Sequence, residues 1–412
     1  MVDVQAIATP LMAPGLGVAA LMGGATMVEQ IQVALSHDID DVEPAWRALE
    51  AQGIESPGQS FDFTRLWIDK LRIPKSEQLF VTATVAGRVV ALLPLERKKR
   101  FGVYAWVWFA GPHVGCHAPL IDAIWFASLC REQRAAFWSR LLFRLPGADL
   151  VTLGEVPERA YGIDGIFDEL GHAVPIDTLY RASFSSWDEA NTTQRSKSRR
   201  KHDRQQGERL EALGAVSFEA IGGGDESGPV LAEMFRQRAR RFEVMRVPDP
   251  FSIPEVAAFY AATVAADSPV PVKLHVLRLD GEIVATRYSI VSGDRLFCLI
   301  SSMSDDERIQ GGSPGKQILL RVMQTMFDEG FRIFDMGCGF TDEKRHWCNV
   351  QIALRRHYVA LTPMGHLALG LDALKRAARA KVKGNKRLLA WAKAWRASRH
   401  RSTEVVAEGE AE

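Results

Sequence analysis

The sequence predicts an α/β fold in which two similar domains follow one another, each a mixed sheet flanked by helices. Two short matches carry this prediction. Gly87-Arg-Val-Val-Ala91 resembles Gly281-Glu-Ile-Val-Ala285, and segment 147–154 resembles segment 330–337, with a glycine at both ends of each. The same order of predicted strands and helices surrounds both matches. Because 412 residues suffice for about two domains with ample cores, a duplicated domain explains the pattern.

We place the first domain at residues 36–185 and the second at 186–370, on apolar periodicity and turn residues. In the first we expect helices at 46–51, 63–71 and 125–145, and strands at 79–85, 89–94, 104–109 and 150–153. In the second we expect strands at 273–279, 283–291, 295–301 and 331–336, and helices at 234–242, 257–266 and directly after residue 313.

Composition excludes some classes of protein. The formal net charge of +1 gives no global attraction to nucleic acid, and we expect no nucleic-acid partner. Five scattered cysteines predict free thiols in a reducing compartment, hence a cytoplasmic protein. Cys338, His346 and Cys348 have no fourth ligand at a suitable spacing, so we expect no metal site.

The first 35 residues are small and apolar, interrupted by prolines and glycines. They have no basic start, which argues against a secretory signal, and no uncharged helical span of ~20 residues for a membrane. We expect residues 1–35 to be a disordered tail or an overlong predicted start.

Two further segments carry candidate functional residues. His113, Cys116 and His117 either pack their own loop or line an acceptor cleft. The run 194–209 holds seven Lys or Arg and no aromatic residue, which weakens a base-stacking interpretation. It is either a solvated inter-domain helix or a grip on an anionic acceptor.

The most informative stretch runs from Gln310 to Trp347, as loop, helix, strand and charged turn. Gly311 and Gly312 precede the predicted helix and Gly315 lies in its first turn. Ser313 is a residue type favoured at a helix N-cap, and Pro314 is favoured at the first helical position. A glycine-rich loop at a helix N-terminus binds phosphate readily, although such loops also occur as plain tight turns.

This stretch resembles the coenzyme A-binding core of the GNAT acyltransferases. It is similar to the CelD-like branch, acetyltransferases of cellulose and exopolysaccharide biosynthesis that are related in fold to the FemABX peptidyltransferases. The resemblance covers roughly residues 40–365 and rests on Gln310-Gly-Gly-Ser-Pro-Gly315, Asp335-Met-Gly337, Lys344 and Trp347. Ser313 stands where the family's loop has its first glycine, and Glu343 stands where an aromatic residue usually precedes the lysine.

The resemblance implies tandem GNAT-like domains, of which the second binds acetyl-CoA or another acyl-CoA between splayed parallel strands. The first, which lacks the glycine loop, would be degenerate and supply a substrate groove. The implied pyrophosphate-binding residues are Gln310, Gly311, Gly312, Ser313, Gly315 and Lys316. Asp335 is the implied proton acceptor and Lys344 would hold the acceptor or steady the oxyanion, with Glu343 or Tyr288 as the next candidate bases. Asp335 as a structural carboxylate and Lys344 as a surface lysine remain alternatives.

The C-terminal segment 371–412 is a basic helix followed by an acidic tail. Residues 371–401 hold eleven Lys or Arg, one acid and two tryptophans. They suit either peripheral contact with the inner membrane face or a terminal helix docked on the protein.

The predicted function is transfer of an acyl group from coenzyme A to an amine or hydroxyl of a small-molecule, sugar or lipid-linked acceptor in polysaccharide or cell-envelope biosynthesis. A FemABX-like aminoacyl-tRNA-dependent transferase and a non-catalytic accessory protein of a polysaccharide synthase are the alternatives. The near-zero net charge and the glycine loop favour the coenzyme A enzyme over the tRNA-dependent one.

Overall fold

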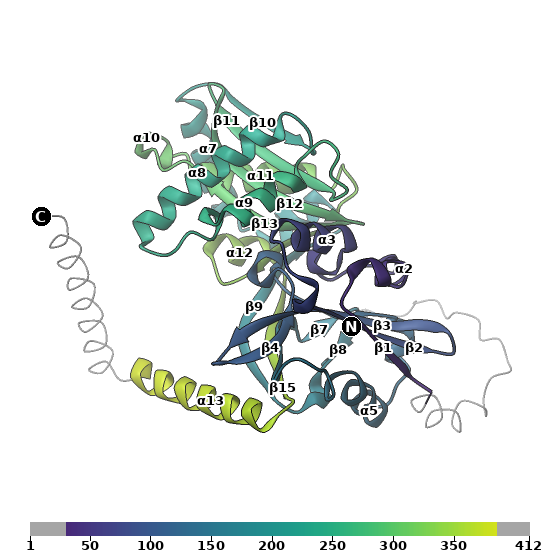
Figure 1. The fold of residues 1–412 in the computed structure, drawn as a ribbon. Helices are drawn as coiled ribbons and strands as arrows, with labels where there is room; N and C mark the ends of the chain where they lie inside the picture. Colours follow the sequence, from purple (N-terminus) through teal and green to yellow (C-terminus); the bar gives the residue numbers. More distant parts are fainter. Residues whose placement is uncertain (1–29, 385–412) are drawn as a thin grey trace, which may run out of the picture.

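The computed structural model describes residues 30–384 and has the α/β fold that the sequence predicts. Figure 1 shows two lobes, each with helices packed on strands, joined across the middle of the molecule. Segments 1–29 and 385–412 lie outside the described residues, and with them most of the predicted N-terminal tail and the two C-terminal tryptophans.

The first half of the chain forms most of the lower lobe of Figure 1. Its strands are β1 (Gln32–Ser36), β2 (Gln78–Val85), β3 (Arg88–Arg100), β4 (Val103–Trp108), β5 (Leu120–Ile121), β6 (Leu150–Pro157), β7 (Arg159–Ala160), β8 (Ile163–Asp164) and β9 (Ala173–Ser183). Its helices are α2 (Ile39–Glu50), α3 (Phe61–Lys70), α4 (Ala123–Ala127), α5 (Arg131–Leu142) and α6 (Trp187–Glu189).

Two expectations for this half need correction. Residues 32–35 of the predicted tail belong to β1, which pairs antiparallel with β2, so the folded part begins before residue 36. The single helix expected at 125–145 is two helices, α4 and α5. The break follows from local hydrogen bonding, because the Ser128 hydroxyl donates to the Trp125 carbonyl (2.6 Å) where α4 ends.

The second half repeats this order in the upper lobe. Its helices are α7 (Lys197–Glu211), α8 (Ser227–Met245), α9 (Pro254–Thr263), α10 (Glu307–Gln310), α11 (Pro314–Thr325), α12 (Asp342–Trp347) and α13 (Pro363–Gly384). Its strands are β10 (Val216–Ile221), β11 (Val272–Leu279), β12 (Glu282–Ser292), β13 (Arg295–Met303), β14 (Ile333–Cys338) and β15 (Val350–Ala360). The series from β1 through α5 to β6 therefore has a counterpart from β10 through α11 to β14.

The matching glycines of the sequence repeat occupy equivalent turns. Ala86 and Gly87 connect β2 to β3 with φ of 48° and 77°, and Asp280 and Gly281 connect β11 to β12 with φ of 50° and 85°. Both are two-residue hairpin turns with positive φ at each residue, which glycine adopts without strain.

The strands join into one continuous sheet, which the sequence analysis did not predict. Its order is β1-β2-β3-β4-β6-β15-β9-β14-β13-β12-β11-β10, with β5 beside β3. The two halves exchange their last strands: β15 of the second half pairs with β6 of the first, and β9 of the first pairs with β14 of the second. Each half-sheet is thus completed by a strand from the other half.

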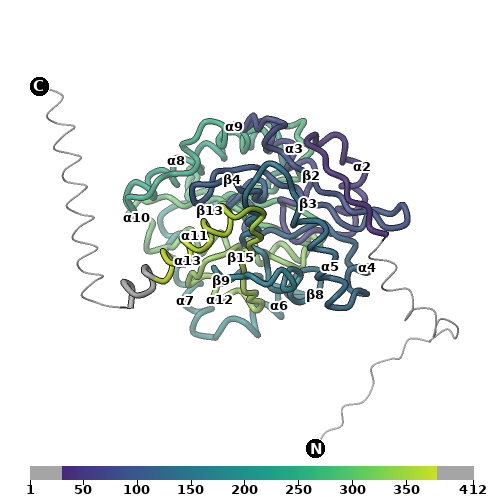
Figure 2. Tube along the Cα trace, turned by 60° about the horizontal axis from the view of Figure 1, so that its bottom comes forward, coloured from purple at the N-terminus to yellow at the C-terminus, as the bar shows by residue number. Residues whose placement is uncertain are grey.

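The two lobes also share a hydrophobic core. Phe63 and Trp67 of α3 pack edge-on against Phe259 of α9, with ring centroids 5.0 and 4.9 Å apart. These helices occupy equivalent places in the repeat, so the junction has approximate twofold character. Helix α13 follows β15 and lies along the lower lobe (Figures 1 and 2). Within residues 30–384 no helix is long and apolar enough to cross a membrane.

Candidate functional site

The candidate site lies where β13 and β14 separate. These parallel strands pair only from Arg295 to Phe297 and from Ile333 to Asp335, and then diverge. Helix α11 begins beside this wedge and α12 follows β14. The splay matches the expectation for the second domain, and it places strand ends and two helix starts around one gap.

The three glycines of the loop have different surroundings. A Cβ on Gly312 would lie 2.8 Å from the Leu210 side chain, and one on Gly315 would lie 2.9 Å from the Met303 sulfur. Gly311 has no heavy atom within 4 Å of such a Cβ. Close packing therefore explains Gly312 and Gly315, and only Gly311 faces open space.

Ser313 does not cap α11 as expected. It has left-handed φ and ψ of 48° and 63°, and its side chain makes no capping hydrogen bond to the helix. Instead its hydroxyl accepts a hydrogen bond of 2.7 Å from the amide of Gln206 on α7. The Gln310 side chain donates to the Ser304 carbonyl, and the Lys316 ammonium has no hydrogen bond or ion pair within the described part of the chain.

Residues 197–209 of the basic run form nearly all of α7, which is solvated on one face and packed against the second half on the other. Buried Arg195 pairs with Asp203, and Arg199, also largely covered, pairs with the same carboxylate at 3.0 Å. The carbonyl of Asp203 accepts from Gln317 of α11 at 2.8 Å. This face of α7 therefore holds the glycine loop, while Lys197, Lys201, Arg204 and Arg209 are exposed.

Asp335 is buried in an ion network that connects the two halves. Its Oδ2 accepts from Arg181 Nε at 2.7 Å, and its Oδ1 accepts from the Gly337 amide at 2.9 Å. Arg181 also contacts Glu55, whose carboxylate pairs with Arg295, each at 3.0 Å. Both oxygens of Asp335 thus have protein partners, and its side chain is only 5% exposed. This is the geometry of a structural carboxylate.

Lys344 is also buried. Its ammonium donates to the carbonyls of Gly337 and Cys338, the first at 3.2 Å, and lies 5.6 Å from the Tyr180 ring centroid. Thr341 caps α12 by accepting from the Lys344 amide (3.3 Å). Burial lowers the pKa of this lysine. The turn therefore brings Asp335 and Lys344 to the same residue, since Asp335 accepts from the Gly337 N–H and Lys344 donates to the Gly337 carbonyl.

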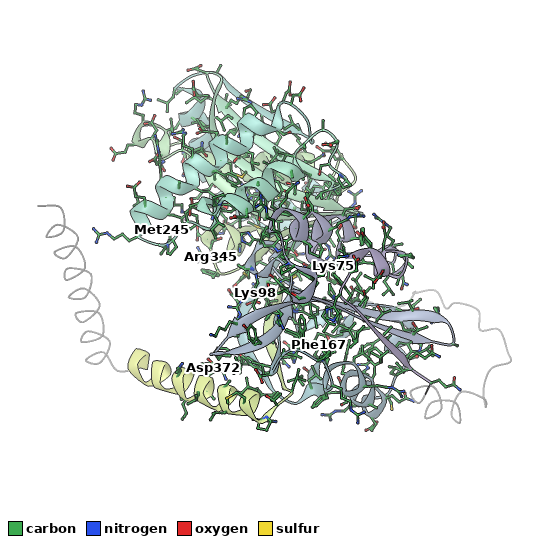
Figure 3. The ribbon with its side chains drawn as sticks, in the orientation of Figure 1. Lys75, Lys98, Phe167, Met245, Arg345 and Asp372 are labelled. Atoms are coloured by element: carbon green, nitrogen blue, oxygen red, sulfur yellow. The ribbon has the colours of Figure 1, made fainter. Side chains whose placement is uncertain are left out.

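A second carboxylate lies closer to the start of α11. Glu343 accepts from Arg287 at 2.9 Å, and the same guanidinium donates to the Gly315 carbonyl at 3.2 Å. Arg287 is 4% exposed and Glu343 27%, so the arginine is fixed and the carboxylate reaches solvent. Tyr288 is fully buried and donates to Thr263, which excludes it as a base. Figure 3 labels Arg345, two residues after Glu343 on α12, near the junction of the lobes.

The loop 111–117 both packs and lines a cavity. His113 lies 3.1 Å from the Tyr260 hydroxyl of the other half, and the Cys116 thiol donates to the Glu55 carbonyl. His117 lines a cavity in the first half. The loop therefore packs against other segments and also contributes to a cavity, and its role in an acceptor cleft stays a prediction.

Comparisons with known proteins agree with this geometry. Residues 197–345 match the family model described as "Acetyltransferase (GNAT) domain". These residues include α7, the wedge and most of α12, so this part of the chain is similar to a GNAT acetyltransferase domain, and the match supports an acyltransferase. No curated protein sequence matches the chain.

The fold resembles that of solved structures. FemX aligns over 81% of this chain and 99% of its own, with a TM-score of 0.53 at 10% identity. A tandem GNAT protein from the clavulanic acid biosynthesis pathway aligns over 81% and 99%, with a TM-score of 0.42 at 11% identity. Saccharomyces cerevisiae N-myristoyltransferase, solved with bound myristoyl-CoA, aligns over 80% and 79%, with a TM-score of 0.37 at 8% identity. At these identities the likeness to FemX shows the fold alone.

The arginines of the site were not predicted from the sequence. Arg287 stands in the largely buried strand β12, Arg181 in the buried end of β9, and Arg295 at the start of β13. A charged residue within an apolar strand pattern is a signal that could have identified them, because a buried guanidinium requires a carboxylate partner. Which carboxylate it would pair with, 56 to 240 residues away, was not readable from spacing.

Proposed function

We propose that the chain transfers an acyl group from coenzyme A to an amine or hydroxyl, and that the wedge between β13 and β14 receives the donor. The observation that carries this proposal is the combination of the splayed strands with the N-terminus of α11 in a GNAT domain. Helix N-termini attract phosphate through free N–H groups and the helix dipole.

The residues around α11 fit such a donor. Gly311 leaves open space on one side of the loop, and the Gly315 amide has no backbone acceptor within the described residues. The Lys316 ammonium, also without an ion partner there, would pair with a phosphate. Coenzyme A, when bound, supplies the acyl group as a thioester, which is open to attack by a nucleophile.

Glu343 is the carboxylate we assign to proton acceptance. An amine or hydroxyl that attacks a thioester must lose a proton, and a carboxylate within hydrogen-bond reach takes it directly or through water. Glu343 has the partial exposure that an acceptor needs, whereas Asp335 is enclosed by Arg181 and Gly337. The hydrogen bond from the buried Arg287 guanidinium orients the Glu343 carboxylate. Asp335 and Lys344 then position the Gly337 turn at the end of β14.

Binding of acetyl-CoA, a longer acyl-CoA and free coenzyme A, measured by calorimetry, tests the donor. No binding of any of the three would overturn the proposal. Glu343→Gln should keep this binding and lower turnover with a screened amine acceptor by ~10²–10⁴. Glu307→Gln, an exposed substitution on α10, is the matched control and should keep turnover. Equal turnover in wild type and Glu343→Gln would assign the base elsewhere.

For the acceptor we propose a sugar or lipid-linked precursor of a polysaccharide or the cell envelope. The support is the sequence resemblance to the CelD-like branch together with a fold like that of FemX. A donor titration in which aminoacyl-tRNA binds and acyl-CoA does not would favour the tRNA-dependent alternative. Donor binding without turnover on any acceptor would favour the non-catalytic one.

We also propose peripheral contact of α13 with an anionic membrane, because this helix exposes an apolar stripe. Its members, 48–68% exposed, are Met364, Leu367, Leu371 and Leu374. The opposite face is docked, with Arg376 donating to the Tyr358 hydroxyl at 2.9 Å and pairing with Asp372 (labelled in Figure 3). The sequence beyond Leu374 to residue 401 holds eleven basic residues. An apolar stripe with adjacent basic residues suits a lipid surface.

A further inference from the structure

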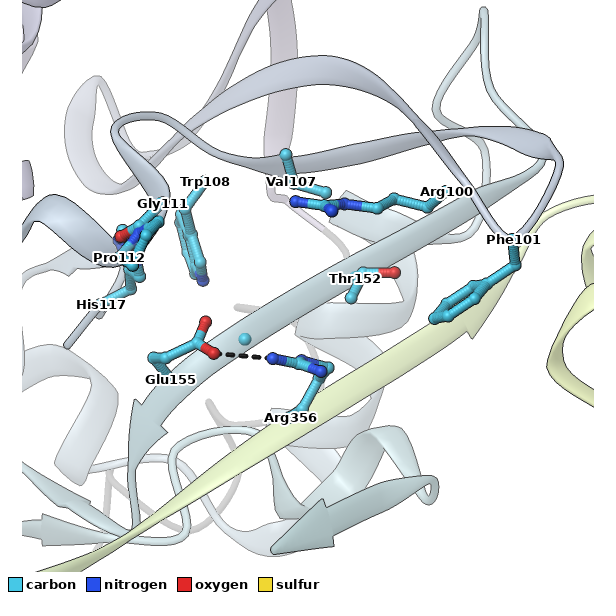
Figure 4. Close-up of a pocket in the computed structure, with 11 residues that line it drawn as sticks. Arg100, Phe101, Val107, Trp108, Gly111, Pro112, His117, Thr152, Glu155 and Arg356 are labelled. Carbon is cyan, nitrogen blue, oxygen red and sulfur yellow. Dashed lines mark hydrogen bonds and ion pairs between the residues drawn. The ribbon is translucent and has the colours of Figure 1, made fainter. Parts of the chain in front are cut away.

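The first half has a wedge of its own, and that wedge contains a cavity. Strands β4 and β6 pair in parallel only from Ala105 to Val107 and from Leu150 to Thr152. Beyond these residues they diverge, as β13 and β14 do. A cavity of about 340 Å³ lies in the gap, a volume at the lower end of ligand sites. Figure 4 shows side chains from β3, β4, β6 and β15 pointing into it.

Two buried polar groups in the cavity have no partner. The indole N–H of Trp108 and the hydroxyl of Thr152 make no hydrogen bond, although their residues are only 5% and 8% exposed. Buried donors and acceptors are nearly always paired, since leaving one unpaired costs free energy. Both residues line the same space, so a ligand with oxygen-bearing groups that reach the indole N–H and the hydroxyl would complete them.

The charges of the cavity favour an anion. Arg356 pairs with Glu155 at 2.6 Å, while the Arg100 guanidinium makes no hydrogen bond or ion pair within residues 30–384 and points into the cavity in Figure 4. His117 adds no charge at neutral pH, because burial lowers its pKa to about 4, and its Nε2 donates to the Gly111 carbonyl (2.8 Å). The lining therefore carries one positive charge in excess.

The backbone is shaped for this arrangement. Glu155 has a positive φ of 53°, which costs energy for a residue with a side chain and aims its carboxylate at Arg356. Gly154 leaves room for the same arginine, since a Cβ there would lie 3.0 Å from Arg356 Nε. Gly154 is also the repeat counterpart of Gly337, so the first half has altered the same turn to hold an ion pair.

The cavity is connected to the second half. The loop that carries His117 continues through Gly115, where a Cβ would lie 3.7 Å from the Gly337 Cα. Gly337 is the residue whose N–H donates to Asp335 and whose carbonyl accepts from Lys344. The loop that lines the first-half cavity therefore contacts the turn at the end of β14, while β15 and β9 lie between the two wedges in the sheet.

We propose that this cavity binds the acceptor, and that the acceptor is a small hydroxylated anion, a sugar carrying one phosphate or carboxylate. The anionic group pairs with Arg100, and ligand oxygens satisfy the Trp108 N–H and the Thr152 hydroxyl. This proposal rests on the acyltransferase function for the ligand's role as acceptor, but the binding itself does not require an acyl donor.

Calorimetric titration without coenzyme A tests the binding separately from the donor site. The probes are glucosamine 6-phosphate and glucuronate, which distinguish a phosphate from a carboxylate. We expect one of them to bind the wild-type chain, and Arg100→Met, Trp108→Phe and Thr152→Val each to weaken that binding by about tenfold or more. Thr152→Val should not lower the melting temperature, because it removes an unpaired buried hydroxyl.

Thr82→Val is the matched control. Its hydroxyl is equally buried and unpaired, but it lies on β2 and does not line the cavity. This variant should bind the probe as the wild type does. The proposal fails if the wild type binds neither probe, or if Thr152→Val and Trp108→Phe bind as tightly as Thr82→Val. Acetyl-CoA binding by the same variants should stay unchanged. An error in the proposed donor site would instead appear as missing acetyl-CoA binding by the wild type, whether or not the probes bind.

Discussion

Asp335→Asn distinguishes a structural from a catalytic carboxylate, and the structure predicts the former. The substitution keeps the shape of the side chain and removes the charge that faces Arg181 at 2.7 Å. Both side chains are less than a tenth exposed, so solvent screens the loss little. Breaking a buried pair typically costs ~3–5 kcal/mol, and the remaining contact of Arg181 with Glu55 keeps the expected cost near ~3 kcal/mol.

This loss of stability predicts a measurable decrease in melting temperature. A chain of this length unfolds with an entropy of roughly 0.8 kcal/mol/K, so Asp335→Asn should lower the melting temperature by ~4 °C. Differential scanning calorimetry measures it. Asp305→Asn is the control, because its pair with Arg240 is about half exposed on both sides and should contribute less than ~1 kcal/mol.

The turnover rate of the same variant tests whether Asp335 is also catalytic. We expect Asp335→Asn to lose far less turnover than Glu343→Gln, when both are assayed below their melting range with the same donor and acceptor. The reasoning would be refuted if Asp335→Asn melted within about 1 °C of the wild type and its turnover fell by ~10²–10⁴. Asp335 would then be the base, as the sequence resemblance implies.

Three further predictions concern binding, acid stability and membranes. Gly311→Glu should weaken acetyl-CoA binding at least tenfold by calorimetry, because it adds a negative charge in open space at the loop. Gly222→Glu, at an equally open position, should bind acetyl-CoA as the wild type does. Equal binding by the two variants would exclude the loop as the pyrophosphate site. Three buried histidines are neutral in the folded state, and burial lowers their pKa to about 4 or about 3: His117, His275 and His357. These histidines become protonated in the unfolded chain below pH ~6.5 but stay neutral in the folded one. Each therefore lowers the free energy of unfolding by up to ~1.4 kcal/mol per pH unit below that value. A melting temperature that stays constant from about pH 7 to about pH 5 would contradict this. Leu371→Glu on the α13 stripe should weaken flotation with phosphatidylserine vesicles at low salt, whereas Ile124→Glu, also exposed, should not; no vesicle binding by the full chain would end the membrane proposal.

The glycine loop shows how far local sequence patterns reach. Three glycines in six residues predicted a loop at a helix start, and α11 begins at Pro314 as expected. The pattern did not distinguish a glycine that faces a ligand from one that lets another element approach. That difference depends on Leu210 and Met303, which are remote in sequence, and it changes which substitution tests the site.

What the sequence determined by itself is the central part of each half: a hairpin, a third strand, a helical segment and a wedge strand in that order, the paired hairpin turns at Gly87 and Gly281, and the wedge strand that carries Asp335. These features depend on interactions between near neighbours, namely apolar periodicity, positive φ at turns and helix capping. Tertiary structure alone decided that β9 and β15 exchange between the halves, that Asp335 faces Arg181, and that Trp108 and Thr152 share a cavity. The physical reason is that strand pairing and buried ion pairs are chosen among many distant partners by the packing of the whole core, which no local pattern records.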